Sequence, residues 1–111
     1  MASLTPIEIE AFAIVKAILR DLCDINRLIP RNTSKYVGIL LDDNRNKRIC
    51  RFWFKSKKIH ITIPDENMKP VKYDISSPND IYNYADLLKE SCNRRLAKGA
   101  IEEDELETEG E

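Results

Sequence analysis

Residues 36–63 read YVGILLDDNRNKRICRFWFKSKKIHITI, and this stretch decides the fold. It holds three short apolar runs, at 36–41, 48–54 and 59–63, separated by two polar turns. The runs are rich in β-branched and aromatic residues, and apolar and polar side chains alternate in the third. Because the connections are short, the stretch predicts three consecutive antiparallel strands.

Successive side chains of a regular strand point to opposite faces of the sheet, so the middle strand contributes residues to both faces. One face carries Cys50, Phe52 and Phe54, and the other carries Ile49, Arg51 and Trp53. We therefore expect one covered face and one face that presents Arg51, Trp53, His60 and Thr62, or their alternates, depending on the register of the strands.

Two capping motifs predict the helices. Thr5-Pro6-Ile7-Glu8 has a capping threonine, a proline at the first helical position and a glutamate three residues after the cap, so a helix is expected over 6–23. Ser77-Pro78-Asn79-Asp80 repeats this pattern with Asp in place of Glu, and it predicts a second helix that ends near Gly99.

A fourth alternating segment at 71–76 completes the order α-β-β-β-β-α. The expected fold is of the α+β class, a four-stranded antiparallel meander with two helices packed on one face. Its 111 residues fit a single domain, placed at 1–99, followed by a disordered acidic tail at 100–111.

Charge is distributed unevenly along the chain. Residues 31–72 hold eleven Lys or Arg against four Asp or Glu, whereas residues 102–111 hold seven acids and no base. The basic middle coincides with the predicted sheet. An exposed basic surface with an aromatic side chain is typical of nucleic-acid contact.

Composition argues against several classes of protein. No apolar run reaches the roughly 20 residues of a membrane span, and we see no secretory signal at the start of the sequence. The three cysteines form no C-x-x-C pair, so we expect no disulfide framework, a reducing cytoplasmic setting and no membrane partner.

No catalytic or metal motif is complete. Asp42-x-Asn44-x-Asn46 resembles the start of a calcium loop, but Lys47 stands where glycine is needed and Trp53 where the bidentate glutamate belongs. No Glu-x-Lys or Asp-x-Lys triplet follows the turn, and the single histidine, His60, lacks a catalytic partner at motif spacing. We expect no enzymatic activity, no metal and no cofactor.

The candidate nucleic-acid contacts come from the basic part of the predicted sheet and its turn. They are Arg48, Arg51, Trp53, Lys55, Lys57, Lys58 and His60. The competing interpretation is a solvated face, with Trp53 beneath a helix and Arg51 paired to Asp42 or Asp43 across the hairpin.

Several segments together resemble a known family. They are Thr5-Pro6-x-Glu8, Arg31-Asn32-Thr33-x-x-Tyr36, Ile39-Leu40-Leu41-Asp42-Asp43-Asn44, Ile49-Cys50-Arg51-x-x-Phe54, Lys58-Ile59-x-Ile61 and Asp80-Ile81-Tyr82-x-Tyr84. The chain resembles, over about residues 5–95, the C-terminal accessory domain of bacterial proteins similar to the type I restriction enzyme R-subunit. In that setting the catalytic carboxylates and lysine lie in a preceding nuclease domain.

The resemblance implies a non-catalytic accessory domain of a restriction or defence nuclease that aids DNA engagement, with DNA and a nuclease domain or subunit as partners. Two alternatives remain open. One is a protein-interaction or homodimerisation module that does not bind nucleic acid, and the other is a regulator whose acidic tail imitates nucleic acid.

Overall fold

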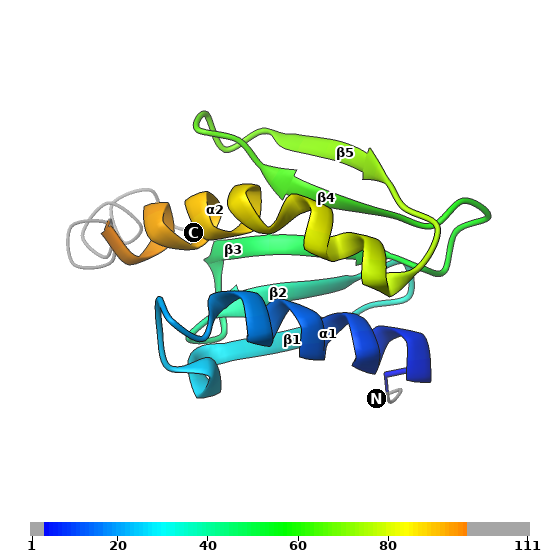
Figure 1. The fold of residues 1–111 in the computed structure, drawn as a ribbon, viewed down its shortest axis with the longest axis horizontal. Coiled ribbons are helices and arrows are strands. Elements are labelled where there is room, and N and C mark those ends of the chain that lie inside the picture. The colour runs from blue at the N-terminus through cyan, green and yellow to red at the C-terminus, as the bar shows by residue number, and fades with distance from the viewer. Residues whose placement is uncertain (1–3, 98–111) are drawn as a thin grey trace.

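Five strands pair in chain order, each antiparallel to the next, and both helices pack on one side of the sheet (Figure 1). The computed structural model describes residues 4–97. Its elements are α1 (Pro6–Leu19), the 3-10 turn η1 (Ile25–Arg27), β1 (Leu28–Asn32), β2 (Val37–Leu41), β3 (Asn44–Trp53), β4 (His60–Pro64), β5 (Pro70–Asp74), the 3-10 helix η2 (Pro78–Tyr84) and α2 (Ala85–Ala97).

The α+β class and the antiparallel meander are confirmed, but the sheet has five strands where four were predicted. The strand that was not predicted is β1, because Pro30 at its centre argues against a strand. Proline cannot donate to a ladder, so it is tolerated only in an edge strand or at a bulge. β1 is an edge strand with β2 as its single neighbour, and Pro30 lies opposite Ile39.

Helix α1 begins as the capping box predicts. The hydroxyl of Thr5 accepts a hydrogen bond from the amide of Glu8 at 3.4 Å, and Glu8 Oε1 accepts one from the amide of Thr5 at 2.9 Å. The helix ends at Leu19, four residues earlier than expected. The predicted second helix is η2 followed by α2, and Ser77 makes no side-chain cap bond. The predicted tail at 100–111 lies outside the described residues.

The hydrophobic core fills the space between the helices and the sheet. It includes Val15 and Leu19 of α1, Leu88 of α2 and Phe52 of β3, none of which has exposed surface. Phe52 lies between Val37 of β2 and Ile61 of β4 in the ladder. Within residues 4–97, neither helix combines the length and apolar character that crossing a bilayer requires.

A β-bulge interrupts β3 and corrects the predicted alternation. Cys50 lies opposite Ile39, but the next pair joins Leu40 to Arg48, so Ile49 is an extra residue on β3. Ile49 and Cys50 are both fully buried in the core, although alternation assigned them to opposite faces. The bulge therefore moves Arg48 to the face opposite the one that regular alternation gives it, and a second register shift follows between Leu40 and Leu41.

Two side chains of α2 bind the carbonyls of the bulge. The hydroxyl of Ser91 donates to the carbonyl of Ile49 at 2.9 Å, and Arg95 Nε donates to the carbonyl of Arg48 at 2.7 Å. Both side chains are fully buried. A buried carbonyl without a partner is costly, so these bonds stabilise the irregular backbone.

We predict that Ser91→Ala destabilises the fold by about 1–2 kcal/mol, because it leaves the buried Ile49 carbonyl without this donor. Denaturant unfolding followed by circular dichroism measures the change. Ser34→Ala, at an exposed position between β1 and β2, is the matched control. Equal unfolding midpoints for the two variants would show that the Ser91 bond does not support the bulge.

Candidate functional site

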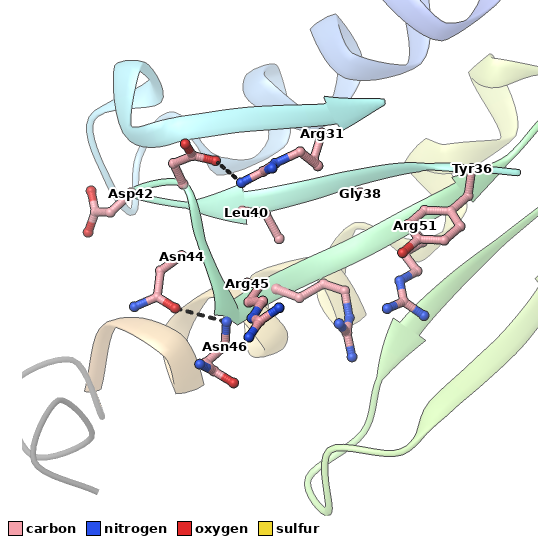
Figure 2. A pocket seen from close by; sticks show the side chains of 11 residues that line it. Arg31, Tyr36, Gly38, Leu40, Asp42, Asn44, Arg45, Asn46 and Arg51 are labelled. Carbon is pink, nitrogen blue, oxygen red and sulfur yellow. Dashed lines mark hydrogen bonds and ion pairs between the residues drawn. The ribbon is translucent and has the colours of Figure 1, made fainter. Parts of the chain in front are cut away.

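The helix-free face of the sheet contains an open hollow of about 1020 Å³ beside the β2–β3 hairpin (Figure 2). Side chains of β1, β2 and β3 line it, together with the hairpin turn and Tyr36, which precedes β2. The lining residues are Arg31, Tyr36, Gly38, Leu40, Asp42, Asp43, Asn44, Arg45, Asn46, Arg48 and Arg51. Four of the eleven are arginines.

Gly38 and Leu40 of β2 line the hollow between its arginines (Figure 2). A Cβ added at Gly38 would lie 3.6 Å from Cε1 of Tyr36 and 3.9 Å from Cγ of Arg51, which is ordinary contact. Glycine therefore leaves open a space that a longer side chain would occupy. Leu40 is 4% exposed but is not part of the helix-side core, because it faces the hollow.

The bulge brings Arg48 and Arg51 to the same face. Residues three apart in a regular strand point to opposite faces. Here the extra residue changes that relation, because Arg48 lies opposite Leu40 and Arg51 lies opposite Gly38. Those two partners are two residues apart on β2, a step of about 6.5–7 Å in a strand.

The charges of Arg48 and Arg51 affect each other. The pKa of Arg48 is lowered, first by burial and then by the positive charge of Arg51, while Tyr36 acts in the opposite direction. The guanidinium carbon of Arg51 lies 4.5 Å from the centre of the Tyr36 ring, and its Nε is buried without a hydrogen-bond partner. Within residues 4–97, neither arginine forms an ion pair with a carboxylate.

The two aspartates of the hairpin turn pair with other arginines. Arg27 donates to Asp42 through Nε and Nη2, at 2.8 and 2.7 Å, and Arg31 Nη2 donates to Asp43 at 3.1 Å. The alternative pairing of Arg51 with Asp42 or Asp43 therefore does not form. Both aspartates have positive φ, 60° and 57°, as a type I′ hairpin turn requires.

Trp53 and His60 lie next to the hollow on the same sheet face, opposite each other in the ladder. Trp53 Nε1 donates to Thr62 Oγ1 at 3.0 Å. Its ring is 4.9 Å from that of Tyr36 and is stacked on that of His60 at 5.6 Å. Trp53 is thus not beneath a helix, but neighbouring rings already contact its own.

The three predicted lysines lie away from the hollow. Lys55 Nζ lies 3.1 Å from Oε2 of the buried Glu8 and also donates a hydrogen bond to Asn32 Oδ1 at 2.6 Å. The ammonium group of Lys55 is therefore ion-paired at the start of α1. Lys57 and Lys58 are exposed in the β3–β4 loop. The seven predicted residues therefore do not form one cluster.

Sequence reasoning missed Arg31 and Tyr36 as lining residues. Pro30 argued against the strand that carries Arg31, and Tyr36 begins the apolar run at 36–41, which was assigned only as a strand. Tyr36 is only partly buried, and it contacts Arg51 and Trp53 on the helix-free face.

The described residues offer little for metal or covalent chemistry. Residues 4–97 contain no group of three or more His, Cys, Asp or Glu side chains able to hold a metal ion. In the turn whose sequence resembles the start of a calcium loop, Asn44 Oδ1 accepts a hydrogen bond from the amide of Asn46 at 2.9 Å. Cys50 and Cys92 are buried. Burial is the main cause that raises the pKa of the Cys92 thiol to about 12, and the nearby Cys23 is the second cause.

Comparisons of the chain with protein-family models, with curated proteins and with solved structures found no match. The resemblance to the restriction-type accessory domain therefore stays a prediction.

We predict that the pKa of Asp42 lies below its ordinary value of 3.8, because Arg27 hydrogen-bonds its carboxylate and adds positive charge. A lowered folded-state pKa means that the ionised group stabilises the fold above its ordinary pKa. That contribution disappears as the pH falls through the lowered value. A carboxyl NMR titration should show the low midpoint, and Arg27→Gln should raise it toward 3.8. The hypothesis fails if the midpoint is the same in wild type and Arg27→Gln.

Proposed function

We propose that the helix-free face of the sheet binds the phosphate backbone of nucleic acid, and that the chain is a non-catalytic accessory domain of a restriction or defence nuclease. The observation that carries the binding proposal is the pair Arg48 and Arg51. Both line the hollow, and within residues 4–97 no carboxylate neutralises either one. The accessory role rests on the resemblance described above.

The electrostatics of the pair favour an anionic ligand. Burial and the charge of Arg51 already disfavour the charged form of Arg48, as its lowered pKa indicates. A phosphate placed between the two guanidinium groups relieves that repulsion and accepts charge-assisted hydrogen bonds.

The aromatic residues of this face favour backbone contacts over base stacking. Tyr36 contacts Arg51 and Trp53, and Trp53 also contacts His60. A base that stacks on Trp53 must displace one of these rings, whereas a phosphate on Arg48 and Arg51 displaces no ring. Recognition through phosphates carries no direct sequence information, so we expect sequence-independent binding.

The sheet edges favour nucleic-acid binding over homodimerisation by sheet extension. An exposed edge strand invites pairing with another chain, and proline or lysine on the edge opposes this. β1 contains Pro30, and β5 begins at Pro70 and exposes Lys72. Sedimentation of the chain at several concentrations tests this alternative, which a salt-insensitive dimer would favour.

We predict that the 111-residue chain binds fluorescently labelled DNA with an affinity that falls linearly on a plot of log K against log salt. Arg51→Gln should weaken binding about tenfold at low salt, the effect of losing one charge-assisted contact. Arg20→Gln removes the same charge from an exposed position at the end of α1 and is the matched control. Fluorescence anisotropy measures both, and equal affinities would contradict the assignment.

We also predict that Asp43→Asn strengthens DNA binding. The change removes the carboxylate that neutralises Arg31 at the hollow, while asparagine keeps the tolerance for positive φ that the turn requires. Asp74→Asn removes a charge from β5 and is the control. An unchanged or weaker affinity in Asp43→Asn would exclude Arg31 from the binding surface.

A further inference from the structure

Four arginines line the hollow, Arg31, Arg45, Arg48 and Arg51, against two acids, Asp42 and Asp43. Asp42 and Asp43 line the hollow, and each is matched by one arginine, Arg27 and Arg31. Arg48 and Arg51 have no such match within the described part of the chain. A dianionic ligand neutralises both of these adjacent positive charges, whereas a monoanionic ligand neutralises only one.

We propose that the hollow binds a terminal phosphomonoester of a nucleic-acid strand. This inference rests on the proposed function and specifies the group that is recognised. A terminal phosphomonoester carries about −1.5 to −2 charges at pH 7, because its second pKa is about 6. A phosphodiester within a strand carries one negative charge, so it neutralises only half of the Arg48–Arg51 pair.

The position of the pair relative to the hairpin favours a strand end over the middle of a strand. The turn at Asp42 and Asp43 borders the hollow, as does Asn44 (Figure 2). The ion pairs of the turn carry no net charge, so they do not attract a phosphate backbone that continues past them. A strand that ends at Arg48 and Arg51 places its terminal phosphate in the hollow and continues away from the turn.

Three further features suit a compact ligand. Gly38 has no side chain, so the part of the hollow over β2 beside Tyr36 and Arg51 stays open. Asn44 and Asn46 provide amide groups at the hollow, although the side chain of Asn44 already accepts one backbone hydrogen bond. The volume, about 1020 Å³, is at the upper end of the roughly 300–1,000 Å³ typical of small-molecule sites, so it accommodates a terminal nucleotide as well as its phosphate.

The experiment compares three single-stranded oligonucleotides of one sequence, each labelled on an internal base. One carries a 5′-phosphate, one a 3′-phosphate and one no terminal phosphate. The full chain should bind at least one phosphorylated strand about tenfold more tightly than the unphosphorylated strand, the effect of one additional charge-assisted contact. Inorganic phosphate should compete more effectively with that strand than with the unphosphorylated one.

Variants assign this preference to the hollow. Arg48→Gln and Arg51→Gln should each abolish the preference, and Arg20→Gln should retain it. Arg48→Lys and Arg51→Lys keep the charge and should retain part of the preference, which separates loss of binding from loss of folding. Circular dichroism and unfolding midpoints identify any variant that does not fold.

The outcomes separate the two proposals. A preference that depends on Arg48 and Arg51 supports both. Equal binding of all three strands, weakened in Arg48→Gln and Arg51→Gln, overturns the strand-end inference and retains the proposed function. Binding that neither variant affects overturns the assignment of the site, and no binding of any strand at low salt overturns both proposals.

Discussion

The bulge at Ile49 is the constraint on which both faces of the sheet depend. On the helix side it places Ile49 and Cys50 together in the core. On the opposite side it brings Arg48 and Arg51 into one hollow. Because the hydrogen bonds from Ser91 and Arg95 of α2 hold the bulge carbonyls, the packing of a helix on one face determines the charge arrangement on the other.

This arrangement opposes stability at the site. Burial lowers the pKa of Arg48, and repulsion by the equally half-buried Arg51 lowers it further. The stacking of Arg51 on Tyr36 offsets part of that cost, since an exposed cation–π contact contributes about 0.5–1 kcal/mol. The hydrophobic core beneath the site offsets the remaining free-energy cost of the two arginines. Sites that hold unneutralised charge before a ligand arrives are commonly places where function is retained at the expense of stability.

Local signals in the sequence were sufficient for part of the fold. The capping box at Thr5 and Glu8 depends on residues three apart, and it was predicted correctly. Four strands followed from alternation and turn residues. The edge strand was missed because Pro30 is incompatible with most strand positions. The bulge was missed because its supporting bonds come from Ser91 and Arg95, 42 and 47 residues away from the carbonyls they bind. Arg48 and Arg51 were thus named as candidates, but their shared hollow could not be predicted from alternation.

The hairpin turn has a consequence for how the sheet opens. β1 has only one neighbouring strand, so hydrogen bonds secure it on one side. The turn between β2 and β3 holds it through Asp42 and Asp43, which bind Arg27 just before the strand and Arg31 within it. The amide of Asp42 also donates to the carbonyl of Arg27 at 2.7 Å. Because the ion pairs are exposed, salt screens them, and the amides of β1 exchange with solvent faster as ionic strength rises.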